Sequence, residues 1–409
     1  TGVTCCPSRT GFMTGLSTAR FYKYPSAYGF GNHITITELL KKSGYRTGHF
    51  GKWHIGPKNK TSNGTYGIDV IDNGKGGDIS LYGRDAGLVD AAIKFIKKNA
   101  NGDKPFYVNI WGHSTHSPVK PHPNFVKPFS NLVVKRSDFS KTMQTKFNKC
   151  ESVGGNITAA MKQYVADVNA MDKNIARLLK TIDDLGIRDN TLFVFTSDQG
   201  PGKINDGKRK NKNKNKQKQK QKQKQVRVAE AHPQNMVGYA GTYRGGKHDQ
   251  YEGGVRVPFI MRWPGHIKAG VTDTQNIISG MDWLPTLCSI AGIKDIPKKL
   301  DCEDVSDIWF GKIRPRTKTL YWKTHSNDPS MRDGKWKLHF KTKRIKGKKI
   351  KGKKISYVEL YDLSVDPSES NNVADKHPKL VKRLSAKLSA WVNELPKKYF
   401  DNRDRNRKK

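Results

Sequence analysis

Helical spacing alternates with short apolar runs over the first two thirds of this chain. Residues 84–98 place apolar side chains three and four positions apart, and so do residues 161–185, where Gly186 is expected to end the helix. Short buried strands are predicted at 105–112, 191–196 and 257–262. The run at 191–196 is apolar on both faces, so we expect a parallel strand covered by helices on both sides. The alternation indicates an α/β sandwich.

The pattern changes at about residue 312, where short strand-like runs replace the alternation. These runs lie at 319–323, 335–340 and 356–361, and a helical pattern follows at about 377–395. Their order predicts a small antiparallel sheet with one helix. We therefore divide the chain into a main domain at 1–311 and a C-terminal subdomain with a basic tail at 312–409.

The 409 residues carry a formal net charge of +40, and +25 of it lies in three stretches. They are 203–227, 341–354 and 397–409. In the first, lysines alternate with Asn or Gln and cannot bury apolar surface, so a disordered insert is expected. A basic protein attracts nucleic acid, anionic lipid or sulfated glycan, although charge runs can also do no more than solvate a surface. The sequence has no run of about 18 apolar residues that would span a membrane.

The segment Cys5-Cys6-Pro7-Ser8-Arg9 is the first candidate for chemistry. Pro7 suits the first turn of a helix. Cys5 is then expected just before a helix N-terminus, where backbone N–H groups favour an anion, and Arg9 can face the same place. Cysteine is also a common small buried residue, so this segment alone leaves a structural role open.

Further candidates follow the predicted strands or lie in glycine-rich stretches. They are Lys52 and His54, His113 and His116, Asp198 and Gln199, and Lys247. In an open α/β sheet, ligands bind at the carboxyl ends of the strands. The loops that hold His116 and Asp198 are therefore expected to converge.

With these residues the chain resembles the type I, formylglycine-dependent sulfatases of the alkaline-phosphatase superfamily. The most specific matches are Cys-x-Pro-x-Arg at Cys5–Arg9 and Gly-Lys-Trp-His from Gly51, and the match continues in the family's order through 282–286 and 359–374. The resemblance implies a large mixed sheet sandwiched by helices. It also implies a family segment before residue 1, so we expect the sequence to be truncated at its N-terminus.

The resemblance implies that Cys5 is the precursor of the nucleophile. A formylglycine-generating or anaerobic maturation enzyme would convert it to formylglycine, and the spacing to Pro7 and Arg9 selects Cys5 over Cys6. In the family, the hydrated aldehyde attacks sulfur, the alcohol leaves, and the second hydroxyl then expels sulfate. Such a reaction makes Cys5 the centre of the predicted site.

The other predicted catalytic residues are cations and imidazoles. A sulfate ester is anionic, so fixed positive charge from Arg9, Lys52 and Lys247 suits its transition state. The resemblance places His54 beside the formylglycine as a base. It places His116 and Lys247 where the family contacts sulfate and protonates the leaving oxygen.

The resemblance also implies a metal ion, calcium or less often magnesium. Its ligands here would be the formylglycine from Cys5, Asp198 and Gln199, with a pair of Asp residues from the segment expected before residue 1. Gln199 stands where the family usually has Asn and keeps an amide oxygen on one more methylene. Calcium prefers several hard oxygen ligands, so we expect metal binding by this sequence alone to be incomplete.

These features predict a sulfuric ester hydrolase that acts on a sulfated glycan or an aryl ester, in an exported location such as the periplasm, the medium or a lysosome. One alternative is a phosphomonoester or phosphonate hydrolase of the same superfamily, which the presence of Cys5 disfavours. The other is a non-catalytic polyanion-binding protein. Against specific nucleic-acid binding, no aromatic residues interleave with the Lys/Gln repeat.

Overall fold

The computed structural model describes residues 1–56, 63–202, 237–324, 327–344 and 354–397. The insert expected at about 203–227 lies outside these residues, as do most of the basic run at 341–354 and nearly all of the tail. Among the described residues, no helix is both long enough and apolar enough to cross a membrane.

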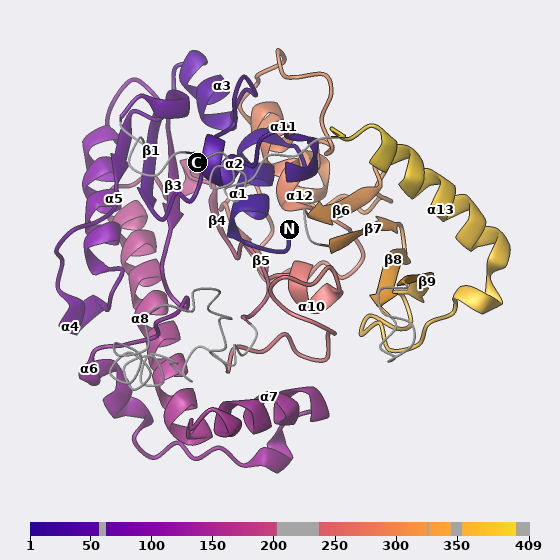
Figure 1. The fold of residues 1–409 in the computed structure, drawn as a ribbon. Helices are drawn as coiled ribbons and strands as arrows, with labels where there is room; N and C mark the ends of the chain where they lie inside the picture. The colour runs from indigo at the N-terminus through magenta and orange to yellow at the C-terminus, as the bar shows by residue number, and fades with distance from the viewer. Residues whose placement is uncertain (57–62, 203–236, 325–326, 345–353, 398–409) are drawn as a thin grey trace, which may run out of the picture.

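A parallel sheet forms the first layer of the structure (Figure 1). It consists of β1 (Arg46–Gly51), β2 (Val70–Asp72) and β3 (Phe106–Trp111), in the order β2-β1-β3. Alternate residues of β3 face opposite sides, as in any strand. Phe106 and Val108 pack against one apolar cluster, whereas Tyr107 and Trp111 pack against another. The sheet is therefore covered on both faces, as an α/β sandwich requires.

Helices that the sequence predicted cover one face of this sheet. They are α5 (Ala86–Asn99) and α8 (Ile157–Asp184), and both predictions are confirmed. Leu88, Phe95 and Leu178 pack in one core cluster with Phe50 of β1. The other face is covered by α1 (Cys5–Thr14), α3 (Ile36–Lys42) and α11 (Trp283–Ile290). Further helices are α2 (Pro25–Tyr28), α4 (Ile79–Tyr82), α6 (Pro123–Val126), α7 (Lys141–Ser152), α10 (Glu252–Val255) and α12 (Ser306–Trp309).

Two more strands form a separate hydrogen-bonded pair, β4 (Phe193–Thr196) and β5 (Phe259–Arg262). The pair is antiparallel, so the expectation of a parallel strand at 191–196 is wrong. Its residues are only half-buried, and Ile260 on the partner strand is 60% exposed. An apolar run has the same pattern in a parallel and in an antiparallel strand. The direction of the strand depends on how the chain connects it to its neighbour. With the parallel layer, this pair gives the mixed α/β architecture that was expected.

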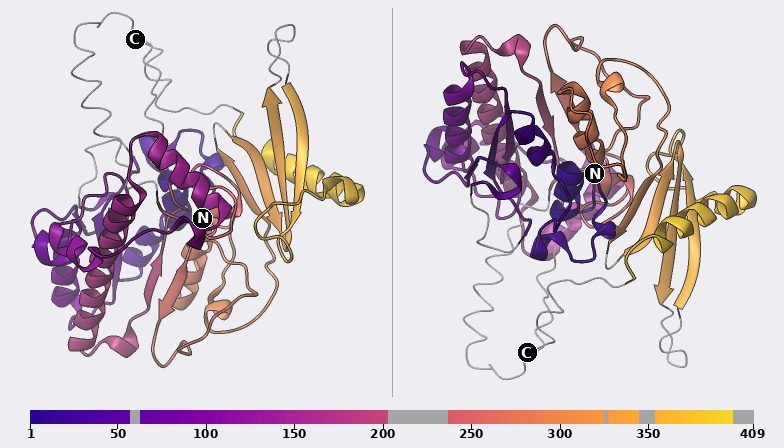
Figure 2. Two further views of the ribbon diagram at one scale, coloured as in Figure 1. Left: turned by 90° about the horizontal axis from the view of Figure 1, so that it is seen from below. Right: turned by 90° about the horizontal axis from the view of Figure 1, so that it is seen from above.

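The C-terminal part is an antiparallel sheet with one helix (Figure 2). Its strands are β6 (Leu320–Thr324), β7 (Asn327–Asp333), β8 (Trp336–Arg344) and β9 (Lys354–Asp362), in sequence order, and the helix is α13 (Pro378–Asn393). Leu338 and Leu360 of the sheet pack against Leu384 and Leu388 of α13. The three predicted strands and the helix are confirmed. β7 was missed because its sequence is polar and contains a proline.

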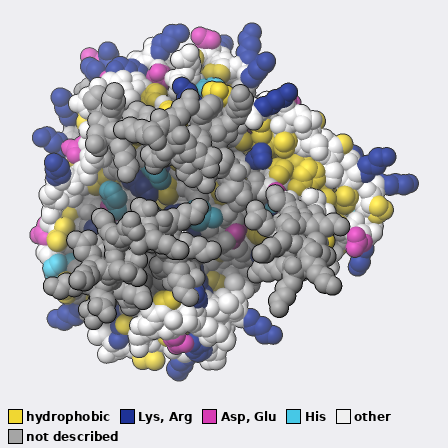
Figure 3. All heavy atoms as spheres, in the orientation of Figure 1, with side chains coloured by type: hydrophobic (Ala, Val, Ile, Leu, Met, Phe, Trp, Pro, Cys, Tyr) yellow, Lys and Arg dark blue, Asp and Glu magenta, His cyan; other side chains and the backbone are white. Residues whose placement is uncertain are grey.

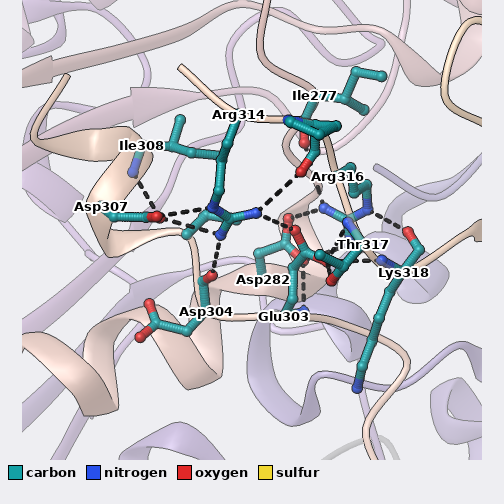
Figure 4. A network of polar contacts seen from close by, with 12 residues as sticks. Ile277, Asp282, Glu303, Asp304, Asp307, Ile308, Arg314, Arg316, Thr317 and Lys318 are labelled. Carbon is teal, nitrogen blue, oxygen red and sulfur yellow. Dashed lines mark hydrogen bonds and ion pairs between the residues drawn. The ribbon is translucent and has the colours of Figure 1, made fainter. Parts of the chain in front are cut away.

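Two arginines tie the segment before this sheet to the main body (Figure 4). Arg316 is buried and donates hydrogen bonds of 2.6 and 2.8 Å to the two carboxylate oxygens of Asp282, which lies at the start of α11. Arg314 pairs with Glu303 at 2.9 Å and with Asp307 at 2.8 Å. The Arg316–Asp282 pair is bidentate and buried, so it fixes geometry as well as adding energy.

A buried charge cluster joins β8 to α10. Lys337 is fully buried, and its Nζ lies 2.6 Å from Glu252 Oε1 and 3.6 Å from Glu369 Oε1. His339 Nε2 lies 2.8 Å from the same oxygen of Glu369. Burial would raise the pKa of Glu252, but the charges of Lys337 and Arg332 outweigh it and lower that pKa. The carboxylate therefore stays ionised beneath the C-terminal sheet.

We predict that Lys337→Met lowers the free energy of unfolding by about 3–5 kcal/mol, because Glu252 is left buried without its closest partner. Urea unfolding at neutral pH measures this loss. The control is Lys335→Met, which removes a half-exposed pair with Asp362 of 2.7 Å and should cost no more than about 1 kcal/mol. Equal losses in the two variants would contradict the prediction.

Candidate active site

Cys5 lies at the beginning of α1, with Thr4 as the residue that precedes the helix. The sequence placed it just before the helix, and the structure makes it the first helical residue, because Pro7 sits third rather than first in the opening turn. Cys5 is 3% exposed. The backbone N–H groups of this first turn lack helical partners, so they favour an anion near the thiol.

Two lysine ammonium groups point to the thiol of Cys5. Lys52 Nζ lies 3.3 Å from Cys5 Sγ, and Lys247 Nζ lies 3.9 Å from it. Lys247 Nζ is also 3.3 Å from His116 Nε2. Four predicted site residues from four distant parts of the chain therefore meet at one point.

The neighbouring thiol of Cys6 has different surroundings. Its Sγ lies 3.9 Å from Thr10 Oγ1 inside the same helix. Burial raises the pKa of Cys6 to about 11. A thiol that is neutral and enclosed is a poor nucleophile, so Cys6 has the properties of a packing residue.

The side chain of Arg9 binds Asp198. Its Nε and Nη2 donate to Asp198 Oδ2 at 3.3 and 3.2 Å, and its Nη1 donates to the backbone carbonyl of Lys52. The guanidinium also lies 4.8 Å from the ring centre of Trp111. Arg9 thus contacts the ends of three strand segments and fixes Asp198.

His54 has an unusual backbone and a strongly perturbed imidazole. Its φ is +59°, in the left-handed region that costs a non-glycine residue about 1–2 kcal/mol. Burial lowers its pKa to about 4, and the charges of Lys52, Arg9 and Lys247 add to the effect. The imidazole is therefore neutral at neutral pH and lies within the field of the same cations that surround Cys5.

His116 presents one ring nitrogen to Lys247. Its Nδ1 lies 2.8 Å from the backbone carbonyl of Ser117, which can only accept, so Nδ1 carries the proton. The other nitrogen, Nε2, then accepts from the ammonium of Lys247 in the neutral ring. Burial lowers the pKa of His116, and the charges of Lys52, Lys247 and Arg84 lower it further.

Arg84, which the sequence did not single out, holds the loop of His116. Its Nη1 donates to the carbonyls of His116 and Pro118, both at 2.8 Å. Its Nη2 donates to the carbonyl of His113 at 2.6 Å and to Asp167 Oδ2 at 2.8 Å. A single guanidinium therefore fixes three carbonyls of one loop, and no local pattern in the sequence reveals such a contact.

Asp85 holds the other side of the same loop. Its carboxylate accepts from the backbone N–H of His113 and of Ser114 at 3.0 Å, and lies 3.0 Å from His113 Nδ1. Burial would raise the pKa of Asp85, but these hydrogen bonds outweigh it and lower the pKa to about 2. His113 is thus occupied by Asp85, whereas His116 faces Lys247.

The oxygen ligands predicted for a metal ion are only partly available. Asp198 is bound by Arg9, and Gln199 Oε1 is buried without a hydrogen-bond partner, which suits an atom that a cation would contact. No group of three or more His, Cys, Asp or Glu side chains within the described ranges could hold a metal ion. Calcium takes about six to eight oxygens, so these residues do not form a complete site, and we derive no chemical step through a metal.

The arrangement suits a tetrahedral anion at Cys5. Fixed ammonium groups beside a buried reacting atom stabilise negative charge that builds up in a transition state. Neutral imidazoles nearby can accept or return a proton at neutral pH. On the face shown in Figure 3, histidine and basic side chains lie near the centre, and further Lys and Arg side chains are spread around the outline.

Comparison with known proteins gives consistent matches over almost the whole chain. Residues 1–293 match the family described as Sulfatase, and residues 245–397 match the one described as N-sulphoglucosamine sulphohydrolase, C-terminal. N-acetylgalactosamine-6-O-sulfatase of Bacteroides thetaiotaomicron is 26% identical over 95% of this chain and 84% of its own length. Arylsulfatase A of Homo sapiens is 25% identical over 93% of this chain and 76% of its own length.

Solved structures share the fold. The structure of PsFucS1 sulfatase from Pseudoalteromonas sp. superposes with a TM-score of 0.66 at 19% identity, covering 97% of this chain and 82% of that one. The structure of Ps i-CgsB in complex with k-i-k-neocarrahexaose gives a TM-score of 0.69 at 20% identity, covering 98% and 86%. At these identities the likeness establishes the architecture.

We predict that His54 titrates near pH 4 in the folded protein and that Lys52→Met moves this pKa upward, because a positive neighbour is removed while the burial remains. NMR of labelled histidines, assigned with His54→Gln, measures both values. The unfolded chain binds the proton near pH 6.5, so the contribution of His54 to stability is present above that pH and is lost as the pH falls to about 4. Lys41→Met, which removes a pair with Asp69, is the control and should not shift His54. Titration of His54 near pH 6.5 in the parent protein would refute the prediction.

Proposed function

Since the chain belongs to the sulfatase family, we propose that it removes sulfate from a sulfated glycan with formylglycine made from Cys5. The chain is a sulfatase, an enzyme that hydrolyses sulfate esters. The observation that carries the proposal is the approach of Lys52 Nζ and Lys247 Nζ to Cys5 Sγ, at 3.3 and 3.9 Å, with His116 behind Lys247. Cys5 Sγ stands here for the oxygen atoms of formylglycine.

The two lysines bind the sulfate group. When present, formylglycine supplies a hydrated aldehyde whose oxygen attacks sulfur and which later releases sulfate. Lys52 and Lys247 each direct an ammonium group at this position, so they contact the sulfate oxygens and offset the charge that grows on them. Arg9 donates hydrogen bonds to Asp198 and to the backbone carbonyl of Lys52, so it is a positioning residue for these two residues.

Lys247, His54 and His116 are the proposed proton-transfer groups. Lys247 Nζ carries a proton beside the reacting atom and can give it to the leaving oxygen, and His116 Nε2 at 3.3 Å lies within reach to exchange it. His54 is neutral because burial and the surrounding cations lower its pKa to about 4. It is therefore ready to accept a proton at neutral pH, as release of sulfate requires.

Asp198 and Gln199 are proposed as two oxygen ligands of a divalent cation. Their hard oxygens favour calcium, with magnesium as the second choice. The support is that Gln199 Oε1 is buried without a hydrogen-bond partner, in the residue that follows Asp198. Sulfatases generally use formylglycine and a divalent metal, and the formylglycine made from Cys5 would supply a further oxygen ligand.

Sulfated glycans are the proposed substrates, with small aryl esters as accepted analogues. Relatives of this chain are named for N-acetylgalactosamine-6-O-sulfate and aryl sulfate hydrolysis. A net charge of +40 favours encounter with a polyanion. We further propose an exported location, a maturation enzyme that acts on Cys5, and a division into catalytic domain 1–311 and C-terminal subdomain 312–409.

We predict that Cys5→Ala, produced together with a maturation enzyme, loses at least about 10³-fold in kcat for a chromogenic aryl sulfate, because no other group can replace the nucleophile. Cys6→Ala should keep most of the activity, since the Cys6 thiol faces Thr10 inside α1. Mass spectrometry of the peptide with Cys5 should show formylglycine in the parent and in Cys6→Ala. Near-parental turnover by Cys5→Ala would overturn the proposed function.

We predict that Arg84→Met lowers kcat by about 10²-fold with a smaller change in KM, because a shift of the His116 loop by about 1 Å misplaces the proton-transfer groups. Steady-state kinetics over pH 5–9 measure the effect. The matched control is Arg177→Met, since Arg177 is exposed to a similar extent but binds Asp90 and Asn174 and stacks on Tyr82, with no hydrogen bond to the His116 loop among the described residues. Equal kcat values for the two variants would show that Arg84 has no positioning role.

A further inference from the structure

A cavity of about 320 Å³ lies between α7 and the loop that leads to Lys247. One stripe of α7 and two tyrosines of the loop line it. The side chains are those of Thr142, Thr145, Lys146, Lys149, Tyr239 and Tyr243. Small-molecule sites span about 300–1,000 Å³, so this cavity is at the small end and suits a ligand of the size of one sugar unit.

The cavity adjoins the candidate active site. Gly245 and Gly246 line it and directly precede Lys247, and Pro201 lines it two positions after Gln199. The backbone N–H of Lys247 donates to the carbonyl of Pro201 at 2.9 Å, which joins these two walls. The cavity and the position of Lys247 therefore share the segment from Gly245 to Lys247.

The described lining of the cavity is positively charged. None of its described lining residues is acidic, and neither Lys146 nor Lys149 forms an ion pair with a carboxylate within the described ranges. Lys146 Nζ donates to the backbone carbonyl of Gly238, and burial lowers its pKa to about 8. Burial disfavours the charged form of Lys146. An anion beside its Nζ would favour that charged form and so oppose the effect of burial.

The remaining lining suits a sugar ring. Thr142 and Thr145 bring hydroxyl groups from the same face of α7 as the lysines. Tyr239 and Tyr243 each offer an apolar ring with a polar end, a combination that can contact both the C–H face and the hydroxyls of a saccharide. One face of the Tyr243 ring is held by Arg256, whose guanidinium lies 4.7 Å from the ring centre.

We propose that this cavity is a second anion-binding subsite, which takes a sulfate or carboxylate on the sugar next to the one that is desulfated. The ammonium groups of Lys146 and Lys149 bind the anion, and the tyrosines contact the ring that carries it. This proposal rests on the proposed function, because a neighbouring sugar reaches the cavity when the substrate is a glycan. It makes the enzyme selective for substrates with a second negative charge.

The test measures binding in a Cys5→Ala background, so that no probe is hydrolysed. Calorimetry compares three disaccharides: one sulfated on both sugars, one with a sulfate and a carboxylate on different sugars, and one with a single sulfate. Lys146→Met and Lys149→Met should each weaken binding of at least one doubly charged probe by about tenfold, since a hydrogen bond to a charged group is lost. Both should leave the singly charged probe within about twofold. Whichever doubly charged probe is weakened identifies the anion.

The matched control is Lys141→Met, on the same helix but outside the cavity lining. It should weaken none of the probes by more than about twofold, which separates a specific site from general charge attraction. Unchanged affinities in Lys146→Met and Lys149→Met, or an equal loss in Lys141→Met, would overturn the subsite. If Lys146→Met fails to fold, the affinities of Lys149→Met for the three probes test the subsite. Hydrolysis of an aryl sulfate by the parent protein tests the proposed function separately, because that ester carries no second charge.

Discussion

The guanidinium of Arg9 is the contact on which the site depends. It is buried, donates two hydrogen bonds to Asp198 at the end of β4, donates to the carbonyl of Lys52 after β1, and lies over Trp111 at the end of β3. α1, which carries Cys5, is thereby joined to three strand ends. A planar group with several fixed donors can do this, whereas a lysine has a single point of charge.

Excess positive charge is the second constraint. Lys52 and Lys247 both approach Cys5 Sγ, and the carboxylate of Asp198 pairs with Arg9. Such an arrangement repels further protons, which is why the pKa of His54 falls to about 4 after the larger effect of burial. An anionic substrate relieves this repulsion. The field that would bind a sulfate thus also keeps the imidazole neutral.

Lys247 depends on the whole molecule for its place. Its backbone N–H bonds Pro201, its side chain contacts Cys5 and His116, and Glu252 five residues later is locked under the C-terminal sheet by Lys337. The C-terminal sheet is therefore connected through this segment to the surroundings of Cys5. The cavity beside α7 shares the same glycine-rich loop, so one segment serves both the reacting position and the neighbouring pocket.

The sequence determined the class of fold, the helices α5, α8 and α13 and six of the nine described strands, and it supplied the candidate residues of the site. Periodicity is a local property, so α5, α8 and the C-terminal strands could be read directly, and the spacing from Cys5 to Arg9 favoured one cysteine over its neighbour. Only the tertiary structure decided the direction of β4, the attachment of Arg9 to Asp198, and the clamp of Arg84 and Asp85 on the His116 loop. These depend on contacts between residues tens to hundreds of positions apart. The local sequence around a strand, an arginine or an aspartate does not specify which distant residue will contact it in the folded protein.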